Sequence, residues 1–274
     1  EVRRSNTQYA IPIEVFMSWK LTVKLNRQLE EPLIVASGSM PTWSITTTTN
    51  FSFLYPLNTR VFFMQSTSFG HSRLIHNWNN RAIKDKSGSS NESTLTTNGA
   101  NLLLGAPARK KVRLARDKIF KSAIKILQQF GLQPPILEME YFDEVGSGLG
   151  PTLEFYASVS KAFCKTELGM WRHNSIDEEY ADSSQGLFPA PISVQNLDPK
   201  NKNILFYFRM LGVFVARALL DSRIMDFNFN LLFISLIQDP RSLDDILGEK
   251  AEITTQLELL RGVDADLARS LKHL

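Results

Sequence analysis

Apolar and polar residues alternate with the period of an α-helix between residues 113 and 130. A stripe of this kind is typical of an amphipathic helix that buries one face. Gly131 suits a C-terminal cap, and the two prolines that follow prevent the helix from continuing. The stripe consists of Ile119, Ala123, Ile124, Leu127 and Phe130, and the opposite face carries Lys118, Lys121 and Lys125.

A strand, a glycine-rich turn and a second helix are predicted next. Residues 136–142 alternate between apolar and acidic side chains, which is the pattern of a half-buried strand. Pro151 is suited to the first turn of a helix that reaches about Cys164. The turn between them contains Gly146, Gly148 and Gly150.

The remaining C-terminal pattern predicts further helices after a polar, acidic loop. The strongest runs from about Asn203 to Asp221, and another covers Phe227 to Ile237. Two short helical patterns, Leu243–Leu247 and Leu267–Leu274, follow.

The N-terminal part predicts a mixture of helix and extended chain. A helix is expected after Pro12, with Phe16, Trp19, Val23 and Leu29 on its apolar face. Short extended runs are expected at Pro32–Ala36, Phe51–Leu54 and Arg60–Gln65, separated by turn residues.

Residues 84–101 are rich in Ser, Thr, Asn and Gly and cannot bury enough apolar surface to offset chain entropy. The expected organisation is therefore a mixed segment at 1–83, a flexible linker at 84–108 and a domain at 109–274. The fold class is α+β, predominantly α.

Composition places the chain among globular proteins, because 43% of its 274 residues are apolar and 22% are charged. One cysteine excludes an internal disulfide, and four scattered histidines make a metal site improbable. The chain has no initiator methionine and no signal peptide, which suggests a fragment of a cytoplasmic or nuclear protein. The apolar stretch Ile204–Leu220 is short for a membrane span and contains Arg209 and Arg217.

The positive charge is concentrated in residues 109–125, which contain eight Lys and Arg residues and one acidic residue, Asp117. This segment is interpreted as the basic start of a helix. A solvated helix face is the default reading, and binding of nucleic acid or of an acidic protein surface is the alternative.

Cys164 is the only thiol, and its spacing along the predicted helix favours a packed position over a nucleophile, although His173 could approach it in space. The glycines match neither a dinucleotide fingerprint nor a P-loop, and Pro151 removes an N–H donor. His71 and His76 are spaced wrongly for one helix face.

The acidic loop, Asp177, Glu178, Glu179 and Asp182, has no motif partner and is expected to be solvated, whereas Asp221, Arg223 and Asp226 are expected to cap or pair locally. No catalytic, cofactor-binding or metal-ligating residue is predicted.

The run LEMEYFDEVGSGLGPTLEFYASVSKAF, followed by LGMW and FYFRMLGVFVARALLDSRIMDFNF, resembles the HECT-type ubiquitin ligases. The resemblance covers about residues 111–274, in the large subdomain of the amino-terminal lobe. The variant Gly148–Tyr156, and the stretch Trp19–Trp43, are similar to the ubiquitin-fusion-degradation subclass.

The resemblance implies a ligase that accepts ubiquitin from a conjugating enzyme on its own cysteine and passes it to substrate lysines, in protein degradation. It implies ubiquitin, a conjugating enzyme and protein substrates as partners, with no nucleic acid, membrane or cofactor. In the family the conjugating-enzyme-docking subdomain and the catalytic cysteine follow this lobe, so the chain is expected to end before both and to be inactive alone. The alternative is a non-catalytic module that binds ubiquitin, substrate or an acidic partner.

The resemblance also implies structural roles. Glu144 and the glycines would shape the turn, and Arg209 and Arg217 would find acidic or carbonyl partners. The residues expected to pack the lobe are Phe155, Tyr156, Leu205, Phe208, Leu211 and Leu219.

Overall fold

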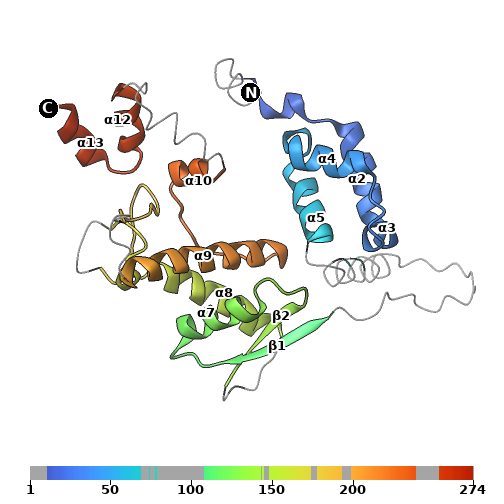
Figure 1. The fold of residues 1–274 in the computed structure, drawn as a ribbon, viewed down its shortest axis with the longest axis horizontal. Coiled ribbons are helices and arrows are strands. Elements are labelled where there is room, and N and C mark those ends of the chain that lie inside the picture. The colour runs from blue at the N-terminus through green and yellow to red at the C-terminus, as the bar shows by residue number, and fades with distance from the viewer. Residues whose placement is uncertain are drawn as a thin grey trace, which may run out of the picture. The chain divides into compact units, whose positions relative to one another are not determined.

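The computed structural model describes residues 11–68, 74, 78, 108–142, 144, 148–173, 178–192, 199–238 and 253–273. Helices dominate, and one two-stranded sheet accompanies them, which confirms the predominantly α, α+β fold class (Figure 1). The chain divides into two units, 1–112 with 132–138 and 113–131 with 139–274. The predicted linker at 84–108 lies outside the described residues, apart from Ala108.

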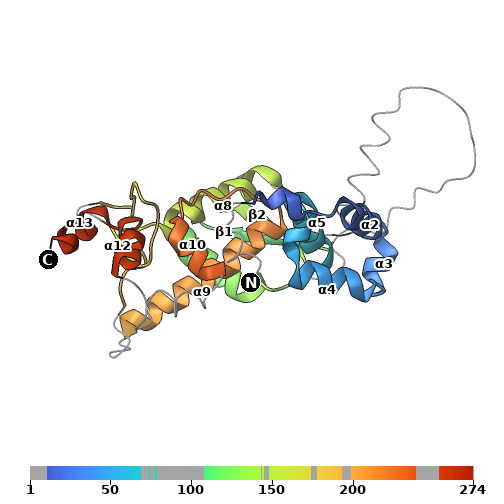
Figure 2. The ribbon, with the colours of Figure 1, turned by 90° about the horizontal axis from the view of Figure 1, so that it is seen from above.

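The N-terminal region is a group of short helices (Figures 1 and 2). Its core consists of Leu25, Leu29 and Tyr55, all almost fully buried. The Tyr55 hydroxyl lies 2.6 Å from Thr47 Oγ1, so its polar end is satisfied inside this core. The elements are η1 (Ile13–Phe16), α2 (Trp19–Glu30), α3 (Pro32–Ala36), α4 (Thr42–Asn50), η2 (Ser52–Leu54) and α5 (Leu57–Thr67).

Three runs predicted as extended chain are helical, so that prediction is wrong. Pro32–Ala36 forms α3, Phe51–Leu54 leads into η2, and Arg60–Gln65 lies inside α5. Pro32 stands in the first turn of α3, and Pro56 directly precedes α5, where a fixed φ favours helix initiation. Packing against the core then holds aromatic residues such as Phe62 and Phe63 in a helix despite their strand propensity.

The predicted apolar face of α2 is also corrected. Trp19 and Val23 are 66% and 53% exposed, whereas Thr22, Leu25 and Leu29 are buried. The buried positions follow the i, i+3, i+7 pattern, so the prediction is right at Leu29 and wrong at Trp19 and Val23.

The sheet in the second half joins β1 (Arg109–Leu114) to β2 (Ile136–Tyr141). Ile136 N–H donates to Ala108 O and Phe142 N–H donates to Leu114 O, so the two strands run parallel. The helix α7 (Ile119–Phe130) forms the crossover between them. The basic run at 109–114 is therefore a strand, and its interpretation as a helix start is wrong.

The helices α7, α8 (Leu149–Phe163) and α9 (Pro199–Leu220) form the centre of this half, and α7 packs against both others (Figure 1). Gly131 ends α7 with an ordinary helical φ of −57°. A Cβ there would lie 2.4 Å from Leu127 O and 2.5 Å from Val213 Cγ1, so glycine is required by a close approach.

Aromatic rings fill the space between α7, α8 and α9. Tyr156 stacks on Phe214 with centroids 5.3 Å apart, and Phe163 lies 5.7 Å from the same ring. Phe155, Tyr156 and Leu211 are buried as predicted. Leu205 and Leu219 are half-exposed, so their predicted packing role is wrong.

The shorter elements are η3 (Thr166–Leu168), α10 (Leu231–Gln238), α12 (Ile253–Arg261) and α13 (Ala265–Lys272). The helix predicted from Phe227 begins at Leu231, because Phe229 forms a bridge with Leu187 instead. The predicted helix at 267–274 corresponds to α13, and α12 was not predicted. The pattern at 243–247 lies outside the described residues.

Among the described residues, α9 contains one stretch, Asn201–Leu220, that is long and apolar enough to cross a membrane by composition. Phe214 and Ala218 on this helix are fully buried within the protein. Leu205 and Leu219 on the same helix are half-exposed, so α9 buries one face and leaves the other accessible.

Candidate functional site

Thr152 connects the strand β2 to the start of α8. Its hydroxyl accepts a hydrogen bond from Met139 N–H at 3.0 Å and donates to Gly148 O at 2.8 Å. Thr152 is 1% exposed, so this hydroxyl satisfies a strand amide that has no access to water. Gly148 has a φ of +113°, which glycine alone adopts readily. The predicted turn is confirmed at Gly148, whereas Gly146 lies outside the described residues and Gly150 is already helical.

Arg116 links Glu144 to Glu154 on α8. Its guanidinium donates to Glu144 and Glu154 and lies 4.0 Å above the Tyr141 ring. The hydrogen bond from Arg116 holds the pKa of the Glu144 carboxyl below its usual range. Burial raises the pKa of Tyr141, partly against the positive charge of Arg116. Two carboxylates therefore stand beside the start of α8, where a phosphate ligand would require positive charge or free donors.

Cys164 caps the C-terminal end of α8 and is partly buried. Its thiol donates to Ser160 O, with the sulfur 3.4 Å away. Burial raises the pKa of this thiol to about 11, and the carboxylates of Asp226 and Asp182 act in the same direction. At pH 7 only about one molecule in ten thousand would carry the thiolate, which is the nucleophilic form.

The acidic loop after α8 is largely solvent-exposed, with backbone contacts that attach it to η3. Thr166 Oγ1 donates to Glu178 O at 2.7 Å, and Lys165 Nζ lies 3.6 Å from Glu179 Oε1. Glu178, Glu179 and Asp182 are exposed, while Asp177 lies outside the described residues.

In the part of the chain that the structure describes, no group of three or more His, Cys, Asp or Glu side chains is arranged to hold a metal ion. His173 is exposed on the surface. His71 and His76 lie outside the described residues.

Trp171 is the buried, hydrogen-bonded residue of the LGMW motif. It is 2% exposed, and its indole N–H donates to Phe163 O at 2.8 Å. Phe208, Phe229 and Phe233 surround its ring, with centroids between 5.2 and 5.9 Å away. One side chain thus joins α8, α9 and the segment that leads into α10.

A buried ion pair lies at the end of α9. Arg217 Nε donates to Asp221 Oδ2 at 2.9 Å, and both side chains are almost fully buried. The expected acidic partner of Arg217 is therefore confirmed, and so is the local pairing of Asp221. Arg209 is exposed, so its placement in the interior is wrong.

Asn230 joins three segments and was missed by the sequence reasoning. Its side-chain N–H groups donate to Gln185 O at 2.6 Å and to Gly262 O at 2.8 Å. Its side-chain oxygen accepts from Leu232 N–H at 2.9 Å at the start of α10. An asparagine directly before an apolar run is an N-cap signal that would have identified one of these bonds. The link to Gly262, 32 residues away, has no local signal.

Among the described residues, these contacts support and orient helices and do not assemble a nucleophile with a base. The geometry is that of a scaffold, organised around Thr152, Trp171, Arg217 and Asn230.

A family profile described as HECT-domain (ubiquitin-transferase) matches residues 157–274. The match begins in the middle of α8 and includes the buried helix α9, the Asn230 junction and the pair α12–α13.

Similar proteins include ubiquitin fusion degradation protein 4 of Saccharomyces cerevisiae, which is 42% identical over 94% of this chain. E3 ubiquitin-protein ligase UPL3 of Arabidopsis thaliana is 36% identical over 95%, and E3 ubiquitin-protein ligase TRIP12 of Danio rerio is 31% identical over 96%. The chain spans 17%, 15% and 13% of the lengths of these three relatives, respectively.

Proposed function

The chain belongs to the HECT family of ubiquitin ligases, and we infer from this that it is the scaffold part of a ligase that forms a thioester with ubiquitin. In the proposed reaction, a cysteine thiolate attacks the thioester between ubiquitin and a conjugating enzyme, whose own cysteine leaves. A substrate lysine amine then attacks the new thioester and releases the ligase thiol. Ubiquitin, a conjugating enzyme and a protein substrate are the partners that this reaction requires.

The observation that supports a scaffold role is the state of the only thiol in the chain. A ubiquitin acceptor needs an accessible thiolate, whereas the pKa of Cys164 is raised to about 11 by burial. We therefore assign Cys164 to packing at the end of α8, and place the acceptor cysteine outside these 274 residues, in the full-length protein.

A loading assay with activating enzyme, conjugating enzyme and ubiquitin tests this assignment. The full-length protein should form a ubiquitin adduct that thiol reagents remove, and the Cys164→Ser variant should form it equally well. The 274-residue chain alone should form none. An adduct that disappears in the Cys164→Ser variant would contradict the assignment.

The non-catalytic alternative relied on a free basic segment at residues 109–125. The strand β1 uses part of that charge, because Arg109 and Arg113 pair with Glu138 and Glu140 of β2. Paired side chains are less available to an acidic partner or a nucleic acid, which weighs against this alternative.

A role in protein degradation, in the cytoplasm or the nucleus, completes the proposal. The name of the Saccharomyces cerevisiae relative refers to ubiquitin fusion degradation. A fluorescent reporter fused behind non-cleavable ubiquitin should persist longer in cells that lack the full-length protein. An unchanged reporter half-life would contradict this part of the proposal and leave the thioester assay unaffected.

A further inference from the structure

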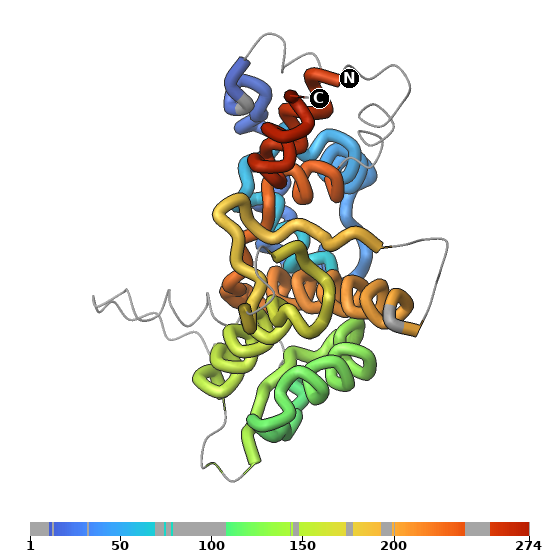
Figure 3. The backbone as a smooth tube through the Cα atoms, turned by 90° about the vertical axis from the view of Figure 1, so that its left-hand side faces the viewer, coloured from blue at the N-terminus to red at the C-terminus, as the bar shows by residue number. Residues whose placement is uncertain are grey.

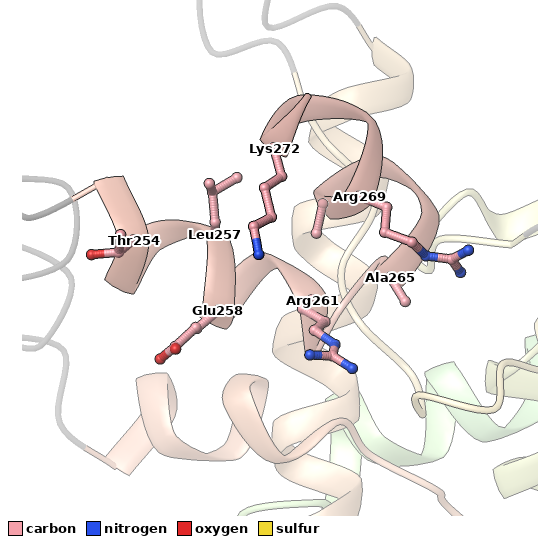
Figure 4. Close-up of a pocket in the computed structure, with 8 residues that line it drawn as sticks. Thr254, Leu257, Glu258, Arg261, Ala265, Arg269 and Lys272 are labelled. Atoms are coloured by element: carbon pink, nitrogen blue, oxygen red, sulfur yellow. The ribbon is translucent and has the colours of Figure 1, made fainter. Parts of the chain in front are cut away.

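A pocket of about 340 Å³ lies between the helices α12 and α13, which stand side by side (Figures 3 and 4). Its volume is at the lower end of the range of about 300–1,000 Å³ for ligand sites. Leu257 and Thr254 line it from α12, and Ala265 and Ala268 line it from α13.

The pocket exists because α13 presents small side chains to the space between it and α12. Ala265 and Ala268 are three positions apart and present only methyl groups to the space between the helices. Larger residues at these positions would interdigitate with α12 and fill the gap. The floor is therefore apolar, formed by Leu257 and the two alanines, and has room for one inserted side chain.

Positive charge surrounds this apolar floor. Among the described residues that line the pocket, Arg261, Arg269 and Lys272 are positively charged and Glu258 alone is negatively charged. In Figure 4 the side chain of Lys272 extends from α13 toward α12. Arg269 pairs with Asp266 at 2.7 Å. Neither Arg261 nor Lys272 has an ion-pair partner among the described residues, so both are available to an anionic ligand.

The turn between the two helices is fixed by polar contacts outside the pocket. Asn230 donates to Gly262 O at 2.8 Å, and Arg172 pairs with Asp264 at 2.5 Å. Asp264 also caps α13 by accepting from Leu267 N–H at 2.9 Å. Because the helix pair is held before any ligand binds, little ordering cost opposes binding.

We propose that this pocket binds an acidic peptide segment of a partner protein. One apolar side chain of the segment enters between Leu257 and Ala268, and neighbouring carboxylates pair with Arg261 and Lys272. The apolar floor and Glu258 disfavour a phosphate backbone, and none of the described residues that line the pocket offers an aromatic ring for base stacking. A membrane surface would require an outward-facing apolar face, whereas this floor lies between two helices. The proposal goes beyond ligase chemistry and does not depend on it.

Fluorescence anisotropy with the 274-residue chain tests the proposal directly. The probe is a short fluorescein-labelled peptide of alternating glutamate and leucine. We expect saturable binding that weakens at least about tenfold, or about 1.4 kcal/mol, when Arg261→Glu and Lys272→Glu are combined. Arg261→Gln with Lys272→Gln is a milder second variant and should weaken binding in the same direction.

Two further variants distinguish the effect of the pocket's shape on peptide binding from the effect of its charge. Ala265→Leu fills the pocket without changing its charge and should also weaken binding of the peptide at least about tenfold. Lys121→Glu with Lys125→Glu reverses two exposed charges on α7 and should leave binding unchanged. Circular dichroism confirms that each variant remains folded.

Three results would overturn the proposal. The first is the absence of binding at peptide concentrations up to about 1 mM, the weak end of specific recognition. The second is equal binding by the wild type and the Arg261→Glu, Lys272→Glu variant. The third is binding of single-stranded DNA or phosphatidylserine vesicles that competes with the peptide and exceeds it in affinity. A peptide with serine in place of leucine should bind more weakly, and equal binding would remove the role of the apolar floor.

Discussion

The helices at residues 11–68 and those around α9 are built on different kinds of core. The N-terminal core is one small cluster around Leu25, Leu29 and Tyr55, formed by helices of at most 12 residues. The core around α9 joins α7, α8 and α9, which have 12, 15 and 22 residues, through packed aromatic rings, and includes the buried pair Arg217–Asp221. Short helices are marginal on their own and depend on tertiary packing, whereas a long amphipathic helix is already indicated by its own periodicity. The comparison explains why one region was predicted well and the other poorly.

The largest expected effect tests the buried ion pair Arg217–Asp221 of the α9 core. Asp221→Ala leaves the Arg217 charge buried without this partner, and we expect a loss of about 3–5 kcal/mol in the free energy of unfolding. Urea denaturation followed by circular dichroism measures it. Arg209→Ala, on the exposed side of the same helix, is the control and should stay within about 0.5 kcal/mol. Equal losses in the two variants would mean that the buried ion pair does not contribute to the free energy of unfolding beyond what an exposed charge contributes.

The second prediction concerns the N-terminal core. Leu25 is fully buried, so Leu25→Ala should cost about 2–5 kcal/mol in the stability of this region. Trp19→Ala on the same helix removes a larger but mostly exposed side chain and should cost much less. Hydrogen exchange of the α2 amides resolves the two variants. A larger effect of Trp19→Ala would show that its exposed face is covered in solution.

A third prediction isolates one hydrogen bond between β2 and α8. Thr152→Val keeps the volume but leaves the buried Met139 N–H without its acceptor, which should cost about 1–3 kcal/mol. Urea denaturation measures the loss. Thr152→Ser keeps the hydroxyl and serves as the matched control, with most of the stability retained. If Val and Ser behave alike, packing and not the hydrogen bond explains the burial of this residue.

The smallest effect is a pH dependence at the end of α8. Burial raises the pKa of Cys164 to about 11, so the folded state favours the neutral thiol. This preference contributes to the stability of the folded protein in full below pH 9, the usual thiol pKa. The contribution is lost as the pH rises from 9 toward 11. Below pH 9, iodoacetamide should alkylate Cys164 about a hundredfold more slowly than an unshifted thiol. An alkylation rate that stops rising near pH 9 would contradict the raised pKa of Cys164.

The sequence was sufficient for elements whose pattern is long and whose burial follows from that pattern. The helix α9, the strand β2 and the buried stripe of α7 appear close to where their periodicity places them. The family resemblance placed Leu205 and Leu219 in the core, but both are half-exposed, because apolar character does not tell which face of an almost continuously apolar helix is covered.

The wrong and missed predictions share one cause, which is contacts between residues that are far apart in the sequence. β1 was mistaken for a helix start, because its lysines and arginines resemble a polar helix face until β2 supplies glutamates opposite them. The contacts of Thr152 with Met139 and of Asn230 with Gly262 join residues 13 and 32 positions apart, and no local spacing encodes them. The family resemblance identified the chain correctly, but it did not predict these contacts either.

The close approach at Gly131 determines which amino acids this position can accept. A side chain at this position would overlap both the α7 backbone and Val213 of α9, while Gly150 has no atom within 4 Å of the position of a Cβ. In a saturation-mutagenesis library read out by abundance, position 131 should therefore accept no other residue. Position 150 should tolerate alanine, although Gly150, like Gly131, stands at the end of a helix.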